Sequence, residues 1–201
     1  MLRFLVLFFI PLAVCAVTTP ASATPSQDPD TLSVPNESVY QLDTEWTTQD
    51  NDNIQLASFR GQPQLMALIY THCGTVCPRM VGNMKQILSD LPEEMRGRVG
   101  RILVTIDPER DTPAQLRSYA EAHGLDLNQW TLLHGNEPQV RELAAVLGVR
   151  FKQEGNGMFS HSSQITVLDG QGVMQHQQQR LGDGTEVTVA AVENLLSPTA
   201  E

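Results

Sequence analysis

The amino-acid sequence predicts an α/β domain in which helices flank a central mixed β-sheet. The run 65–70 is short, continuous and apolar, which is typical of a strand buried on both faces, and 99–106 is expected to be a second apolar strand. The segment between them, 79–91, has its apolar residues at helical spacing. Because strands that alternate with helices favour parallel pairing, these elements form the expected centre of the sheet.

The other elements follow from turn signals, proline positions and periodicity. An N-terminal β-hairpin is expected over 39–59, with its turn at 50–53. Further elements are a helix over 113–123, a strand over 130–133, a helix over 138–147, a hairpin of 163–168 and 173–178 around a glycine-rich turn, and a closing helix over 186–196. This order is that of a thioredoxin-like fold.

The N-terminus is read as a targeting segment. Residues 1–23 combine Arg3, a short apolar run and the small residues Ala21-Ser22-Ala23, as expected of a cleavable signal peptide. Cleavage near Ala23 predicts an exported, periplasmic protein, which associates with a membrane only if the leader is retained. Cys15 suggests a lipoprotein alternative, but Val14 stands where a small residue is expected. Residues 24–38 are predicted to be a flexible tether, and 39–201 the folded domain.

Composition narrows the class of partner. The 201 residues include 41% hydrophobic and 18% charged residues, a normal balance for one globular domain. The formal net charge is −10, from 13 basic and 23 acidic residues, and the basic residues form no cluster. Nucleic acid is therefore not an expected partner.

Two cysteines carry the main chemical signal. Once residues 1–23 are removed, Cys73 and Cys77 are the only cysteines, and they lie where a predicted strand leads into a helix. Helix N-termini favour thiolate, and four-residue spacing suits a dithiol, a disulfide or a two-thiolate metal clamp. Two sulfur donors suit Cu(I), and an added imidazole also accommodates Cu(II). A structural disulfide or a pair of buried thiols remains the alternative.

The five histidines differ in their prospects as a third ligand. His123, His134 and His176 are expected to have structural or solvent-facing roles. His161 lies in a stretch expected to be flexible and can reach the cysteine loop, while His72 is a competing ligand whose side chain is expected to point away from Cys73. The charged segment 107–113 is expected to form a loop and helix start, with Asp111 or Thr112 near the N-cap.

Three stretches together resemble the Sco/SenC family of copper-binding thioredoxin-like proteins. They are Tyr70-Thr-His-Cys-Gly-Thr-Val-Cys-Pro78, Val104-Thr-Ile-Asp-Pro-Glu-Arg-Asp-Thr-Pro113, and His161-Ser with Leu168-Asp-Gly-Gln-Gly172. The resemblance covers residues 40–196. It implies copper ligation by Cys73, Cys77 and His161, and a role in building the copper centre of cytochrome c oxidase, by delivering copper or reducing the target's cysteines. A copper donor and a copper-accepting protein, such as an oxidase subunit, are the implied partners.

The sequence departs from this family at two positions. Gly74 stands where proline is usual, and Ser160 stands where an aspartate usually precedes the histidine. Without that carboxylate, a backbone group or water is expected to orient the imidazole of His161.

The sequence is compatible with three functions. The first is a copper metallochaperone. The second is a thiol–disulfide oxidoreductase that cycles Cys73 and Cys77. The third, a peroxidase-like relative, is weakest because no peroxidase-type surrounding of a cysteine is evident. Simple dithiol exchange needs no imidazole, so His161 near the sulfurs favours metal binding.

Overall fold

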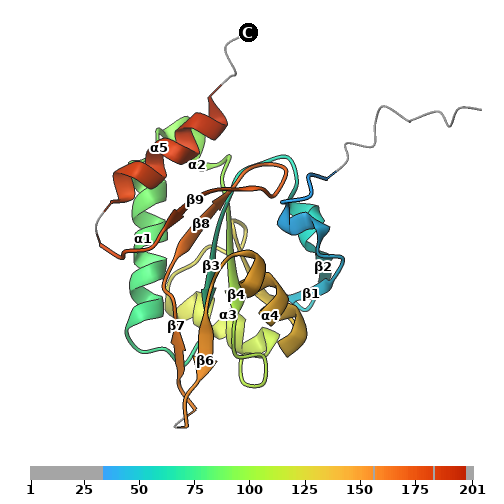
Figure 1. The fold of residues 1–201 in the computed structure, drawn as a ribbon. Coiled ribbons are helices and arrows are strands. Elements are labelled where there is room, and N and C mark those ends of the chain that lie inside the picture. The colour runs from blue at the N-terminus through green and yellow to red at the C-terminus, as the bar shows by residue number, and fades with distance from the viewer. Residues whose placement is uncertain (1–33, 156, 183, 198–201) are drawn as a thin grey trace, which may run out of the picture. The chain divides into compact units, whose positions relative to one another are not determined.

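The computed structural model describes residues 34–155, 157–182 and 184–197, and within them a mixed sheet forms the centre (Figure 1). Its strand order is β2-β1-β5-β4-β3-β8-β9. The strands are β1 (Glu45–Thr48), β2 (Asn53–Gln55), β3 (Gln64–Ile69), β4 (Gly100–Thr105), β5 (Trp130–His134), β8 (Ile165–Leu168) and β9 (Met174–Gln178). β3, β4 and β5 pair in parallel, and the other neighbours pair antiparallel. The predicted thioredoxin-like α/β fold is confirmed.

Helices connect the strands and cover the sheet. They are α1 (Val76–Asp90), α2 (Glu93–Arg96), α3 (Pro113–Ala122), α4 (Glu137–Val146) and α5 (Thr185–Leu196), with 3-10 turns at η1 (Val39–Gln41) and η2 (Leu56–Phe59). α1 and α3 each join parallel neighbours, so right-handed crossovers place both on one face. α5 packs against α1, as Figure 1 shows for the red and green helices. No helix in the described ranges has both the length and the apolar character needed to cross a bilayer.

The burial of the central strands explains why their sequence pattern was informative. Every residue of β3 is buried, and β4 is buried except at its first residue. Both strands therefore carry mostly apolar residues on both faces, with Gln64, Arg101 and Thr105 as the buried polar exceptions. Because β3, β4 and β5 run in the same direction, their carboxyl ends lie at one edge of the sheet. The loops that follow them carry the candidate functional residues.

The N-terminal part differs in detail from the expectation. The predicted hairpin is the β1–β2 pair, shorter than 39–59 and bounded by η1 and η2. The predicted signal peptide, 1–23, and most of the predicted tether lie outside the described residues. The last tether residues are held in place, since Ser38 is 3% exposed, donates its N–H to the Pro35 carbonyl and forms a β-bridge with Val173.

One pair of strands was not predicted. β6 (Phe151–Gln153) and β7 (Phe159–His161) form a separate antiparallel sheet in a segment expected to be flexible around His161. Figure 1 shows this hairpin beside the loop that enters α1. Each strand has only three residues and includes exposed polar positions, so neither gives a clear alternation in the sequence.

Two glycine-to-alanine substitutions are expected to change stability in opposite directions. Gly172 has φ +77°, and a Cβ there would lie 2.6 Å from Tyr40 Cδ2 and 2.7 Å from Ser38 Oγ. Gly172→Ala should lower the free energy of unfolding by about 1–3 kcal/mol. Gly82 is exposed within α1, with nothing within 4 Å of its added Cβ, so Gly82→Ala should raise that free energy by about 0.5–1 kcal/mol. Urea denaturation measures both, and equal shifts would contradict this account.

Candidate metal centre

The cysteine loop joins the buried end of β3 to the N-terminus of α1. The helix begins at Val76, not at 79 as expected, which places Cys77 in its first turn. Thr75 occupies the N-cap position without a side-chain hydrogen bond, while the Cys77 N–H donates to Cys73 Sγ at 3.3 Å. The sulfur of Cys73 thus takes the place of an N-cap oxygen. A Cβ at Gly74 would meet nothing within 4 Å, so the loop does not require glycine for space there.

The two thiols have opposite acidities. Burial raises the pKa of Cys73, but hydrogen bonds from Cys77, Thr75 and Val76 outweigh burial and hold that pKa below its ordinary value. Burial raises the pKa of Cys77 far above its ordinary value, and the neighbouring Cys73 adds to the rise. The first cysteine therefore becomes a thiolate more readily than the second.

The β6–β7 hairpin brings His161 to this loop. In β7, His161 pairs with Phe151 of β6. Tyr70, at the end of β3, braces the hairpin, since its hydroxyl donates to the Phe159 carbonyl at 3.4 Å and its ring meets the His161 imidazole edge-on at 5.9 Å. The expectation of a flexible stretch was therefore wrong for the residues next to His161. Sequence reasoning also missed this role of Tyr70, which it had placed only at the end of an apolar run and at the start of the cysteine motif.

The three predicted ligands converge. His161 Nε2 lies 3.8 Å from Cys77 Sγ, and the ligand atoms of Cys73, Cys77 and His161 all lie within 4.8 Å of one another. Both thiols are free and buried, and His161 is half-buried. A single ion between these atoms can contact two sulfurs and one nitrogen, a soft donor set suited to copper or zinc. The same sulfurs are close enough to approach disulfide geometry after a small movement.

The imidazole of His161 is oriented for coordination through Nε2. Its Nδ1 lies 3.2 Å from the Ser162 carbonyl oxygen, which can only accept, so Nδ1 carries the proton and the Nε2 lone pair faces Cys77. A backbone group thus orients the ring, as expected from Ser160. Burial lowers the pKa of His161 although the Ser162 carbonyl opposes this, which favours the neutral, coordinating form.

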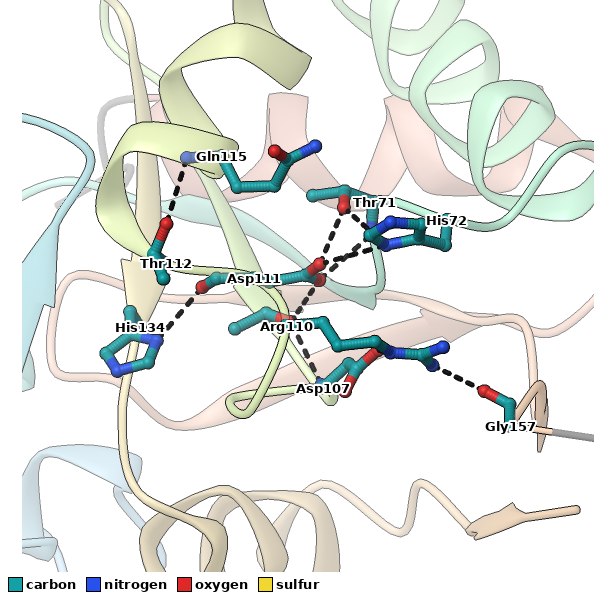
Figure 2. A network of polar contacts seen from close by, with 10 residues as sticks. Thr71, His72, Asp107, Arg110, Asp111, Thr112, Gln115, His134 and Gly157 are labelled. Carbon is teal, nitrogen blue, oxygen red and sulfur yellow. Dashed lines mark hydrogen bonds and ion pairs between the residues drawn. The ribbon is translucent and has the colours of Figure 1, made fainter. Parts of the chain in front are cut away.

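The other histidines have separate surroundings. Their contacts are His72 Nδ1 with Thr71 Oγ1 at 3.1 Å, His123 Nδ1 with the Tyr119 carbonyl at 2.9 Å, His134 Nδ1 with the Asp111 carbonyl at 3.0 Å, and His176 Nε2 with Thr188 Oγ1 at 3.1 Å. His72 is turned toward Asp111 rather than the sulfurs, as expected (Figure 2). The structural roles expected for the remaining three agree with these contacts.

Asp111 has a larger role than the sequence indicated. Thr112, not Asp111, is the N-cap of α3, because its side chain accepts from the Gln115 N–H at 3.3 Å. Asp111 is fully buried and accepts from the N–H and the hydroxyl of Thr71, at 2.9 and 2.6 Å (Figure 2). It also accepts from the Thr105 hydroxyl at 2.6 Å. The cysteine loop is therefore fixed from its first residue.

Comparison with known proteins identifies a family. A family model described as SCO1/SenC matches residues 36–197. The SCO1 protein homolog of Bacillus subtilis is 31% identical over 127 residues, covering 62% of this chain and 65% of that protein. The SCO2-like protein RT0576 of Rickettsia typhi is 28% identical over 130 residues, covering 62% of each chain. The matches thus span less than two thirds of these relatives' length.

Solved structures share the fold. A SCO1/SenC family lipoprotein from Bacillus anthracis aligns with a TM-score of 0.69 at 21% identity, covering 77% of this chain and 93% of that one. ScoI from Bradyrhizobium japonicum, solved with copper bound, aligns with a TM-score of 0.63 at 24% identity, covering 75% and 96%. At these identities the likeness establishes the fold alone.

The asymmetry of the thiols predicts selective alkylation. Because the thiolate is the nucleophile, iodoacetamide at neutral pH should label Cys73 first in the reduced protein, at least about tenfold faster than Cys77. Cys73 should also keep reacting at a pH below the range in which an ordinary cysteine reacts, because its pKa is lowered. Peptide mass spectrometry measures both rates, with urea-unfolded protein as the control in which they should become equal. Faster labelling of Cys77 would contradict the assignment.

Proposed function

The chain belongs to the SCO1/SenC family, and from this premise we propose that it binds one copper ion through Cys73, Cys77 and His161 and passes it to a copper-dependent protein. The observation that carries the proposal is the convergence of the three ligand atoms within 4.8 Å. The solved ScoI structure from Bradyrhizobium japonicum is described with copper bound, which supports copper as the cargo.

The donor set favours copper over hard cations. Magnesium and calcium prefer oxygen ligands, whereas thiolates select soft metals such as Cu(I). Cys73 supplies a thiolate because its pKa is lowered by the hydrogen bonds of the helix N-terminus, which outweigh burial. Cys77 is held protonated by burial until a cation displaces its proton, so metal uptake should release a proton. His161 supplies the nitrogen that Cu(II) requires.

Reduction of a partner's disulfide is the second candidate, and the contrast between the two thiol pKa values supports it. In that reaction the Cys73 thiolate attacks the partner's disulfide, forming a mixed disulfide and releasing one partner thiolate. Cys77 then loses its proton and attacks Cys73 Sγ, releasing the second partner thiolate and leaving this chain oxidised. Reducing the cysteines of a copper acceptor would prepare them as ligands.

The cellular setting follows from the same proposal. We place the protein in an exported compartment, supported by the leader-like composition of residues 1–23. Its proposed partners are a copper donor and a copper acceptor of the cytochrome c oxidase type, in keeping with its family.

Anaerobic copper titration of the reduced protein tests the ligand set. We expect one copper per chain, with tight binding lost in Cys73→Ser and in Cys77→Ser. His161→Ala should keep appreciable Cu(I) binding, because two thiolates can hold Cu(I), and should lose the thiolate-to-Cu(II) charge-transfer absorption.

His72→Ala is the matched control, since His72 adjoins Cys73 but turns toward Asp111. Loss of the Cu(II) spectrum in the His72 variant and not in the His161 variant would reject His161 as the ligand. Undiminished affinity in both cysteine variants would reject copper binding at this site.

Oxidation of the cysteine pair should block metal uptake. A disulfide has no thiolate to offer, so protein in which thiol counting finds no free cysteine should bind no copper tightly. Reduction followed by removal of the reductant should restore one copper per chain. Full loading of the oxidised protein would refute this expectation.

A further inference from the structure

The strand that carries His161 depends on contacts outside its own sheet. β6 and β7 form a two-stranded sheet of three residues each, separate from the central sheet. An isolated two-stranded hairpin is marginally stable in water. Tyr70 holds this hairpin at Phe159 through a hydrogen bond of 3.4 Å, which is long. The rings of Tyr70 and Phe159 are also in contact, with centroids 5.4 Å apart, so the position of His161 depends on side chains outside the hairpin.

Arg110 provides a charged contact to the tip of the hairpin. Its Nη2 donates to the Gly157 carbonyl (Figure 2). Its guanidinium carbon lies 6.0 Å from the centroid of the Phe159 ring. Its Nε donates to Asp107 Oδ2, and the Asp107 side chain is 2% exposed. The Arg110 N–H also donates to the Asp107 carbonyl at 3.1 Å. A buried carboxylate thus fixes the arginine, and the arginine fixes the hairpin.

The carboxylates in this region are engaged by protein donors. His72, Asp107 and Asp111 have ligand atoms within 4.8 Å of one another. Asp111 accepts from Thr71 and Thr105, and Asp107 accepts from Arg110. A metal ion bound here would have to displace these bonds. Because protein donors already occupy these carboxylates, the cluster holds neighbouring segments in place rather than binding a metal.

The loop that contains Asp107, Arg110 and Asp111 contacts both the cysteine loop and the hairpin that carries His161. Asp107 and Asp111 lie in one loop after β4, in which the Asp111 N–H donates to the Asp107 carbonyl at 2.9 Å. Through Asp111 this loop holds Thr71, two residues before Cys73, and through Arg110 it holds Gly157, four residues before His161. One loop therefore sets the position of the imidazole relative to the sulfurs.

We propose that Arg110 is a positioning residue that holds the His161 hairpin over the cysteine loop. The proposal rests on the proposed copper site. Charge-assisted bonds from a planar guanidinium fork constrain direction as well as distance, and a lysine at the same place supplies only a single ammonium. Loss of Arg110 should weaken the histidine-dependent Cu(II) complex more than the Cu(I) complex that the two sulfurs hold.

Two measurements on the reduced full-length protein test this role. In the metal-free protein, amide hydrogen exchange across β6 and β7 should be faster in Arg110→Ala than in wild type. In the copper-loaded protein, Arg110→Ala should lower Cu(II) affinity about tenfold and weaken the charge-transfer band, while Cu(I) affinity changes by less than about threefold. Arg110→Lys should fall between wild type and Arg110→Ala in both measurements.

Arg98→Ala is the matched control. Arg98 is exposed and lies just before the N-terminal end of β4, whereas Arg110 follows the C-terminal end of that strand. Arg98→Ala should leave exchange and both affinities unchanged. If Arg110→Ala does not fold, the same two measurements on Arg110→Lys, which keeps a cation beside Asp107, test the proposal. Wild-type hairpin exchange and wild-type Cu(II) affinity in a folded Arg110 variant would overturn the proposal. A wild-type protein that binds no copper would refute the proposed function, while the exchange measurement would still decide whether Arg110 holds the hairpin.

Discussion

Asp111 ties together the carboxyl ends of the three parallel strands. Its carboxylate oxygens accept from Thr71 after β3 and from Thr105 at the end of β4, and its backbone carbonyl contacts His134 Nδ1 at the end of β5. A fully buried carboxylate is costly unless donors replace the lost water, so these bonds must form together with the fold. Since Thr71 begins the cysteine loop, the same bonds that satisfy Asp111 also anchor the start of the loop that leads to Cys73 and α1. The cysteine loop is therefore held at one end by a residue that contacts neither sulfur.

The helix N-terminus then distinguishes two cysteines that are otherwise similar. Cys73 lies ahead of the first turn and receives N–H groups, whereas Cys77 lies within the turn and is 0% exposed. Burial acts on both, but only Cys73 has enough donors to reverse its effect on the pKa. A metal site gains one ligand that is ready to bind and one that releases a proton on binding. The same contrast would serve a dithiol reductase, so thiol acidity alone does not separate the two candidate functions; the neutral imidazole aimed at Cys77 favours the metal.

The sequence predicted those features that depend on burial and local spacing. Continuous apolar runs identified β3 and β4, and the cysteines at the end of an apolar run identified one half of the candidate site. It did not predict β6 and β7, because three-residue strands with exposed polar side chains lack a clear period. Nor did it separate the roles of Asp111 and Thr112. Both suit a helix start locally, and only the distant hydroxyl and N–H of Thr71 draw Asp111 into the interior. Spacing placed His161 within reach of the cysteines, but the contact needed a hairpin held by residues from two other loops.

The cysteine loop and the His161 hairpin differ in how firmly the rest of the structure holds them, and this difference bears on the proposed transfer of copper. The cysteine loop is continuous with the buried β3 and with α1, so moving either sulfur far would disrupt the core. His161 belongs to a separate two-stranded sheet, held by Tyr70 and by a side chain, Arg110, that is 37% exposed. In the proposed function, the imidazole would leave the copper through a movement of the hairpin, which disturbs less of the core than a movement of the sulfurs would. In the proposed function, an acceptor that displaces His161 first would meet copper held by two thiolates, a low-coordinate state that suits Cu(I) and leaves a position open for the incoming ligand.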